Sequence, residues 1–326
     1  MRSSIPCLVL WLHLATGFVA QTTTRWSSSS VRPLRLPSSL QSAATDATEA
    51  LSTSQAAFLA ELQAAVPELG AKPANSWPAG AGESVAGAPA VLEAFDAPGP
   101  PNVAWVSSLK VEGKISSLTI LNGPLTDVPH FVSRVNILDD DTMSLFVDWR
   151  PRAYGAYEMI KPDGSYPGPE EIGRDAFTYS GARLNMEKKF FTEEFTAAID
   201  GAKASLLGLG GSVDGSGPVN KEDALTRGPQ AVELKGIPLT PDAIAAVAAL
   251  RATAAKFWLG WQVDVDAHAH RPGAQVNSQY VFDTPAKQNM YTALLAKYSA
   301  LYGDDGVKLA AADSGPLDEG YVGGGS

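Results

Sequence analysis

The sequence predicts a mixed α/β fold in a single domain, and three observations support this prediction. Short runs rich in Val, Ile, Leu, Thr and Phe follow one another between residues 117 and 149, as expected for neighbouring strands. Segments with helical periodicity and helix-start signals lie on both sides of these runs. About 280 residues remain after the N-terminal extension, enough for one large domain.

The first 45 residues resemble targeting signals. Residues 1–20 have the layout of a secretory signal peptide, with Arg2 before the apolar run Pro6–Leu14, which is too short to span a membrane. Residues 21–45 are rich in Ser, Thr and Arg and contain no acid, which is typical of a transit peptide. The two together resemble the bipartite presequences of algae with secondary plastids and predict a plastid location. Secretion with a Ser-rich propeptide is the alternative.

Charge and cysteine content exclude several classes of function. Residues 1–45 hold four of the 25 basic residues and none of the 35 acidic ones, so the rest of the chain has a net charge of −14. Such an acidic chain is poorly suited to nucleic acid or anionic membranes. Cys7 is the only cysteine and leaves with the signal peptide. The mature chain is therefore expected to lack disulfides, thiolate-bound metal, a thiol nucleophile and a thioether-linked tetrapyrrole.

The region before the strands predicts one helix and a loop. Thr53–Val66 is amphipathic at helical spacing, and Pro67 ends it. Gly70–Gly87 is rich in Ala, Gly and Pro and is expected to be a loop. Pro89–Phe95 is expected to form a short helix.

The strands themselves are predicted at Ser117–Leu121, His130–Leu138 and Met143–Trp149. An acidic turn at residues 139–141 joins the last two as an antiparallel hairpin. Alternation along the first hairpin strand places Arg134 and Asn136 on one face.

The second hairpin strand runs into Asp148-Trp149-Arg150-Pro151-Arg152, so a carboxylate, an indole and two guanidinium groups gather at its end. This density of functional groups indicates a site, although half-buried strands of any sheet end in polar residues.

The chain after the hairpin alternates loops and helices. Ala153–Arg174 is Tyr-rich and irregular, as functional loops often are. Phe177–Arg183 could return as a strand, and Thr192 caps a helix that continues to Leu206. The glycines at 208–217 follow a helix and lack the Lys-Ser/Thr of a phosphate loop, so they predict a linker.

Two helices and a tail complete the domain. Thr240-Pro241-Asp242 is a strong helix start, and this helix is expected to reach at least Trp258. A second helix is predicted at Thr284–Tyr302. Residues 303–326 are acidic and Gly-rich and are expected to be an extended, flexible tail.

One stretch could bind a metal ion. In a strand, Asp264, Asp266, His268 and His270 would face one way, and a His/carboxylate mixture suits zinc or iron. Few other His residues are available, and Phe257–Asp266 could equally continue the preceding helix. We therefore predict no metal site, with a metal-dependent enzyme as an alternative.

The hairpin sequence suggests a family. The order P-H-F-V-S-R-V-N-I-L, acidic turn, S-L-F-V-D-W-R-P-R and Tyr-rich segment resembles red chlorophyll catabolite reductases and their relatives, the ferredoxin-dependent bilin reductases. The resemblance covers about residues 105–302 and includes the helix after Phe282-Asp283-Thr284-Pro285. It implies an α/β/α sandwich, with a central antiparallel sheet flanked by helices and a tetrapyrrole between the sheet and the C-terminal helices.

The resemblance also implies a reaction. A linear tetrapyrrole, either red chlorophyll catabolite or a bilin, is reduced in chlorophyll breakdown or bilin metabolism by electrons from reduced ferredoxin, without a bound cofactor. The protein is expected to be a monomer or homodimer. Ferredoxins are acidic, so docking needs a local basic patch, expected from Lys161, Arg174, Lys188 and Lys189.

Such a substrate needs an apolar slot, a protein acid and cations for its propionates. The candidate catalytic residues are Asp283, Asn136 and His130. The candidate substrate-binding residues are Arg134, Asp148, Trp149, Arg150, Arg152 and Arg183.

Arg134 occupies the position where the family usually has an acidic catalytic residue, and Arg is a poor proton donor at neutral pH. The alignment could slip by two residues, Asp283 could deliver protons with an ordered water, or the protein could bind a bilin without reducing it.

Overall fold

A computed structural model describes residues 38–71, 84–85, 87–97, 103–123, 126–138, 141–152, 179–218, 220–264 and 276–315. These residues belong to one compact unit. The predicted signal peptide and most of the transit-like segment lie outside them. Helix α1 (Ser38–Ala65) starts before the boundary expected after residue 45, and its Ala44 is already buried.

The described strands form a nine-stranded antiparallel sheet in the order β1-β3-β4-β5-β6-β7-β9-β8, with β2 paired to β3. Their bounds are β1 Gly70–Ala71, β2 Ser84–Val85, β3 Ala88–Asp96, β4 Val103–Val111, β5 Ile115–Asn122, β6 His130–Ile137, β7 Thr142–Arg150, β8 Ser212–Val213 and β9 Val232–Pro238. The predicted hairpin is β6–β7, in which His130 lies opposite Arg150. The strands predicted at 117–121, 130–138 and 143–149 are therefore confirmed.

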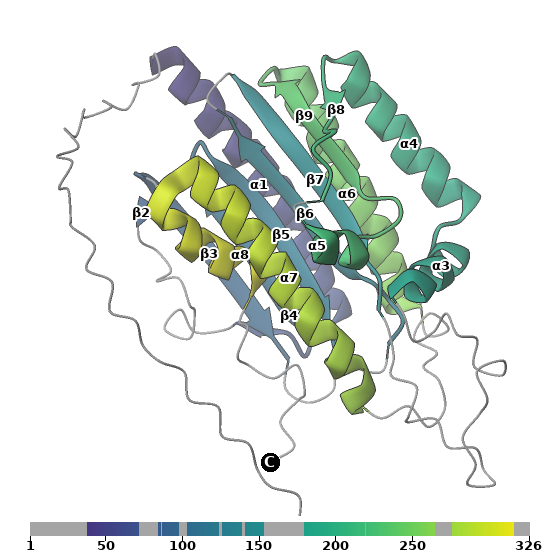
Figure 1. Ribbon diagram of the computed structural model, residues 1–326. Helices are drawn as coiled ribbons and strands as arrows, with labels where there is room; N and C mark the ends of the chain where they lie inside the picture. The colour runs from purple at the N-terminus through teal and green to yellow at the C-terminus, as the bar shows by residue number, and fades with distance from the viewer. Residues whose placement is uncertain are drawn as a thin grey trace, which may run out of the picture. The chain divides into compact units, whose positions relative to one another are not determined.

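Helices cover both faces of the sheet, so the α/β/α sandwich is confirmed (Figure 1). The "α1 face" carries α1, α3 (Tyr179–Phe190), α4 (Glu193–Gly208) and α6 (Pro241–Val263), whose buried side chains join one core. The "α7 face" carries α5 (Lys221–Thr226), α7 (Val276–Tyr302) and α8 (Gly306–Ser314), with a short 3-10 turn, η5 (Gly303–Asp305), between the last two.

Aromatic side chains dominate the core on the α1 face. Trp149 lies 4.9 Å from Phe195 and 6.1 Å from Phe131, measured between ring centroids. Phe131 also stacks on Trp258, whose indole N–H donates to the Pro129 carbonyl at 2.8 Å. Pairs of this kind stabilise a core beyond the area that they bury.

Helix α6 is the one described helix with the length and apolar composition of a membrane span. In this fold its Val247, Leu250 and Trp258 are fully buried against the sheet. An apolar helix with this packing has the character of a core helix. Its start is as predicted, because Thr240 caps it by accepting from the Ala243 N–H and Pro241 occupies the first turn.

Three predicted elements were wrong. The expected helix at Pro89–Phe95 is strand β3, whose pairing with β4 outweighs the helical preference of its alanines. The expected strand at Phe177–Arg183 belongs to α3 from Tyr179 onward. Residues 303–314 of the tail expected to be extended instead form η5 and α8, because Leu309, Ala310 and Ala312 bury apolar surface on the sheet, whereas residues 316–326 lie outside the described part.

Candidate functional site, a charged cavity under helix α7

Strand alternation selects the residues that form the site. His130 and Arg134 on β6, and Phe146, Asp148 and Arg150 on β7, all face α7. Trp149 faces the opposite way, into the aromatic core, and is therefore separated from the other candidate substrate-binding residues. Because side chains alternate along a strand, Asp148 and Arg150 share the face toward α7, and Trp149 between them points to the opposite face.

A cavity of ≈ 220 Å³ lies between these strands, β9 and α7. Phe146, Met290 and Leu294 supply apolar surface. Its cationic lining residues are Arg134, Arg150, Arg227 and Lys297, and its acidic ones are Asp214, Asp223 and Glu233. Small-molecule sites usually enclose about 300–1,000 Å³ and combine apolar walls with a few polar groups. This cavity is somewhat smaller, so it accommodates a small ligand or part of a larger one.

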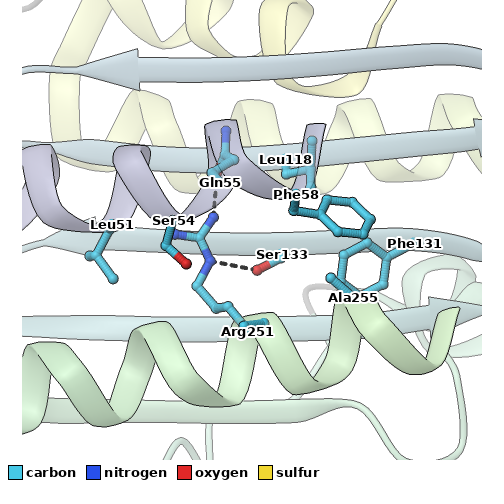
Figure 2. A pocket seen from close by; sticks show the side chains of 10 residues that line it. Leu51, Ser54, Gln55, Phe58, Leu118, Phe131, Ser133, Arg251 and Ala255 are labelled. Atoms are coloured by element: carbon cyan, nitrogen blue, oxygen red, sulfur yellow. Dashed lines mark hydrogen bonds between the residues drawn. The ribbon is translucent and has the colours of Figure 1, made fainter. Parts of the chain in front are cut away.

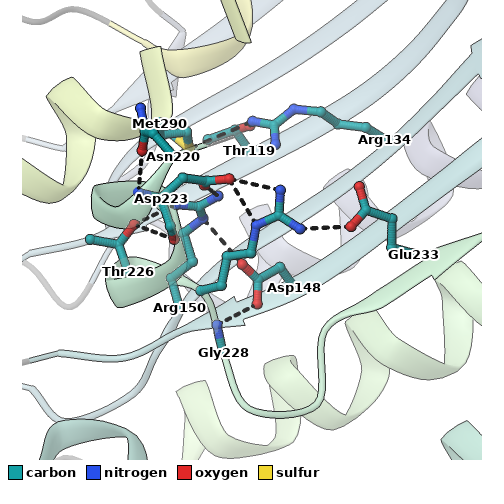
Figure 3. Close-up of polar contacts among 11 residues, drawn as sticks. Thr119, Arg134, Asp148, Arg150, Asn220, Asp223, Thr226, Gly228, Glu233 and Met290 are labelled. Atoms are coloured by element: carbon teal, nitrogen blue, oxygen red, sulfur yellow. Dashed lines mark hydrogen bonds and ion pairs between the residues drawn. The ribbon is translucent and has the colours of Figure 1, made fainter. Parts of the chain in front are cut away.

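Two arginines of the cavity share one carboxylate (Figure 3). Arg227 donates to Asp223 at 2.7 and 2.9 Å and to Glu233 at 2.6 Å. Arg150 lies 3.6 Å from Asp223 and 3.2 Å from Asp148, and donates to Thr226 at 3.2 Å. Both guanidinium groups are therefore held in place by acids before any ligand arrives.

Asp148 is a fully buried carboxylate with a perturbed pKa. Burial raises its pKa above the usual range, and the nearby Arg150 and the Gly228 N–H, which donates at 2.9 Å, oppose this rise. Gly228 approaches so closely that a Cβ there would lie 2.2 Å from the Trp149 carbonyl oxygen. The close approach of the Gly228 backbone therefore fixes one side of the Asp148 carboxylate.

Arg134 belongs to a second network that faces α8. Its guanidinium pairs with Asp313 and donates to Thr119 at 3.1 Å. Asp313 also accepts from the Tyr298 hydroxyl at 2.7 Å and from the Ser117 hydroxyl. The carboxylate that the resemblance expects on β6 is thus replaced by an arginine whose acidic partner comes from α8.

His130, Asp283 and Arg152 form a buried cluster at the end of the hairpin. Arg152 donates to both oxygens of Asp283, at 2.6 and 3.1 Å, and to the Gly123 carbonyl at 2.9 Å. His130 Nε2 lies 3.4 Å from Asp283, and its Nδ1 accepts from the Asn122 N–H at 2.9 Å. Because Nδ1 is an acceptor, the proton of the neutral ring sits on Nε2 and faces Asp283.

The charge states of this cluster follow from burial and neighbours. Burial and the adjacent Arg152 lower the pKa of His130 to about 4, despite the opposing effect of Asp283. Burial alone would raise the pKa of Asp283, but Arg152 and His130 outweigh it, so that pKa falls below its usual range. At neutral pH the histidine is neutral and the aspartate is ionised. A carboxylic acid that donates protons near neutral pH needs a raised pKa, so Asp283 in this state is a poor proton donor.

Lys297 is the cation of the cavity without an acidic partner among the described residues. No described carboxylate lies within ion-pair distance of its ammonium, although Glu233 and Asp214 are close enough to act on it electrostatically. Burial lowers its pKa from the ordinary lysine value, and the nearby Arg134 and Arg227 add to this effect. A ligand with an anionic group would compensate this charge.

The remaining candidates lie elsewhere. Asn136 shares the face of His130, but six residues along a strand correspond to about 20 Å, so it lies far from the His130 cluster. Arg183 lies in α3, and its side chain is outside the described part of the structure. Lys188 and Lys189 end α3, and Lys189 lies 3.2 Å from Asp127, whereas Lys161 and Arg174 fall outside the described residues.

The metal alternative lies mostly outside the described residues. Helix α6 continues to Val263, and Asp264 follows as its C-cap, but Asp266, His268 and His270 are outside the described ranges. Across the part of the chain that the structure describes, no three His, Cys, Asp or Glu side chains gather as a metal site requires.

Comparisons with known proteins do not identify a relative. No family model matches the sequence, and no curated protein matches it.

Sequence reasoning missed Lys297, Arg227, Asp223 and Glu233. Of these four residues, Lys297 was the one that the sequence could most readily have indicated, because Met290, Leu294 and Lys297 follow helical spacing on one side of α7.

Proposed function

We propose that this protein binds a linear tetrapyrrole under α7 and reduces it with electrons from ferredoxin. The observation that carries the proposal is the cavity between the sheet and α7, which is lined by the apolar side chains of Phe146, Met290 and Leu294 and by Lys297, a cation without an acidic partner among the described residues. A linear tetrapyrrole has matching chemistry, with apolar rings and anionic propionates.

The size of the cavity limits how the pigment binds. At ≈ 220 Å³ the cavity accommodates only part of an open-chain tetrapyrrole. We infer that the propionate-bearing part enters and contacts Lys297, while the rest of the pigment extends beyond the cavity. His130 and Asp283 do not line the cavity, but Arg150, which does, lies opposite His130 on the neighbouring strand. We therefore propose that the part of the pigment outside the cavity reaches the His130–Asp283 pair.

Reduction requires protons as well as electrons. At rest, neutral His130 and ionised Asp283 are poor acids. The first electron makes the bound pigment more negative, and a negative charge nearby raises the pKa of both groups. Asp148 is a second candidate proton donor, because burial already raises its pKa. We propose Asp283, with His130, as the proton relay to the reduced pigment.

One experiment separates binding from reduction. The protein is mixed with biliverdin and with red chlorophyll catabolite, and absorbance spectra are recorded before and after reduced ferredoxin is added. A perturbed pigment spectrum that bleaches or shifts with electrons supports the reductase. If neither pigment spectrum changes on mixing, the tetrapyrrole proposal fails. Asp283→Asn is expected to keep pigment binding and lose turnover.

Binding without reduction is the second candidate function. Arg134 stands at the expected acidic position and is neutralised by Asp313, while Arg152 keeps Asp283 ionised. Both observations disfavour proton donation and favour a non-catalytic bilin carrier of the same fold. A bound spectrum that is indifferent to reduced ferredoxin would identify the carrier.

A further inference from the structure

The opposite face of the sheet holds a buried cation whose described partners are all neutral. Arg251 projects from α6 toward α1, and its side chain is buried beneath the two helices. Figure 2 shows its guanidinium between Gln55 of α1 and Ser133 of β6. It donates to Ser133 Oγ at 2.8 Å, to Ser116 Oγ at 2.9 Å and to Gln55 Oε1.

These hydrogen bonds do not neutralise the charge of the Arg251 guanidinium, and they do not use all of its N–H donors. A guanidinium has five N–H groups, and three donate to described residues. No described carboxylate pairs with it. Burial lowers the pKa of Arg251 to about 10, so the group still carries its charge at neutral pH. A buried charge with neutral partners alone is unfavourable.

A small cavity adjoins this guanidinium. It has ≈ 20 Å³ of space, and Ser54, Gln55, Ser133 and Arg251 supply its polar lining. Leu51, Phe58 and Phe131 contribute apolar walls. A space of this size holds about one particle the size of water. Phosphate, sulfate and organic carboxylates are too large for it, whereas a halide ion is not.

We propose that this cavity binds one small monovalent anion, of which chloride is the physiological candidate. The anion accepts hydrogen bonds from the free N–H groups of Arg251 and from the Ser54 hydroxyl, and it neutralises the buried charge. Because it joins α6 to α1 and the sheet, it stabilises the folded protein. This proposal is independent of any ligand under α7.

The test is thermal unfolding of the full chain at constant total salt, with sodium gluconate replaced stepwise by sodium chloride. Gluconate is too large to enter the cavity. We expect the Tm to rise and then saturate, by about 2–4 °C, as expected for a ligand that binds only the folded state. Arg251→Met should abolish the rise. Lys256→Met, an exposed change on the same helix, should leave it intact.

A second pair of variants tests the site even if Arg251→Met fails to fold. Ser54→Asp supplies a fixed carboxylate to the cavity, so its Tm should be indifferent to chloride. Ser54→Ala is the matched neutral control, because it leaves the cavity open and should retain a chloride response. If Ala removes the chloride response as completely as Asp, the response does not depend on neutralising Arg251, and the proposal fails.

Crystals soaked in bromide provide a direct readout. An anomalous peak beside Arg251 is the expected result. Equal Tm values in chloride and gluconate, together with no bromide at Arg251, would overturn the proposal and assign the cavity to water. A chloride response that persists in Arg251→Met would also overturn it.

Discussion

Arg134 and Arg251 are both buried against the central sheet, but on opposite faces and with opposite kinds of partner. Arg134 lies on the α7 face and pairs with the Asp313 carboxylate. Arg251 lies on the α1 face and donates only to hydroxyl and amide oxygens among the described residues. The α7 face also holds the buried acids Asp148 and Asp283.

The difference separates two ways of keeping a cation inside a protein. On the α7 face, carboxylates bring their own hydrogen-bond partners, so arginines and acids form networks that position groups around a cavity. On the α1 face the core is aromatic and aliphatic, and Arg251 is the one buried cation of this face among the described residues. The polar chemistry of the molecule is therefore concentrated on the α7 face, where we propose the ligand to bind.

The largest expected effect is on the free energy of unfolding, and it tests whether Arg134, unlike Arg251, depends on an acidic partner. Asp313→Asn preserves the shape of the side chain but leaves Arg134 with neutral partners, as Arg251 is. Removal of one member of a buried pair is expected to lower the free energy of unfolding by about 3–5 kcal/mol. Denaturant unfolding measures this change.

The control replaces both partners of that pair. Arg134→Met combined with Asp313→Leu removes the charges together and should recover part of the stability, because apolar groups can substitute for a buried ion pair. The recovery is incomplete because the Tyr298 and Ser117 hydroxyls lose their acceptor. An Asp313→Asn variant as stable as the parent would show that neutral oxygens suffice for Arg134.

The hairpin strands were predictable because their signals are local. Turn residues bound each strand, and alternation along each strand separates Arg150 from Trp149 and places Arg134 and Asn136 on one face. The observed pairing of His130 with Arg150 then brings Arg134 and Arg150 to the same face. The partner of Arg134 was not predictable. Asp313 is 179 residues away along the chain, in a segment whose Gly-rich surroundings suggested an extended tail. Only the packing of α8 on the sheet brings the two side chains together.

The helix misassigned at residues 89–95 has a similar cause. Its alanines favour a helix, but an edge of the sheet pairs with this segment and decides its structure. The resemblance to tetrapyrrole reductases gave Asp283 and Arg152 as candidate residues of one site, and in the structure Arg152 does contact Asp283. It did not predict the charge state of Asp283, because the pKa of this residue depends on Arg152, a cation that follows strand β7 and is distant in sequence.

An effect of intermediate size is expected when the pH is lowered, because the stability of the folded protein depends on the protonation of His130 on the α7 face. The folded pKa of His130 is about 4, below the unfolded value of about 6.5, so the unfolded state takes up a proton first as pH falls. His130 therefore contributes a loss of stability between pH 6.5 and 4, of about 3 kcal/mol at most. Urea unfolding across this range measures the slope.

His130→Asn is the informative variant for that slope. The Asn side-chain oxygen can still accept from the Asn122 N–H, but the side chain does not titrate. The dependence of stability on pH between 6.5 and 4 should become shallower. An unchanged slope would place the acid sensitivity in other groups of this face, with Asp283 the first to examine.

The smallest expected effect on stability belongs to Lys297, and this makes it the sharpest probe of the proposed ligand. Its ammonium pairs with no described acid, so Lys297→Met should leave the midpoint of unfolding nearly unchanged. If the cavity receives a pigment carboxylate, the same variant should weaken biliverdin binding about tenfold, because a charge-assisted hydrogen bond is lost. Titration followed by pigment absorbance measures this affinity.

Two further variants make the Lys297 result specific. Lys297→Arg retains the charge and should preserve most of the affinity, whereas Lys256→Met removes an exposed lysine of α6 and should have no effect. Equal affinities for the parent and Lys297→Met would mean that the pigment carboxylates bind elsewhere. In that case the two faces would differ in how they stabilise buried charge, but the cavity under α7 would no longer be the preferred ligand site.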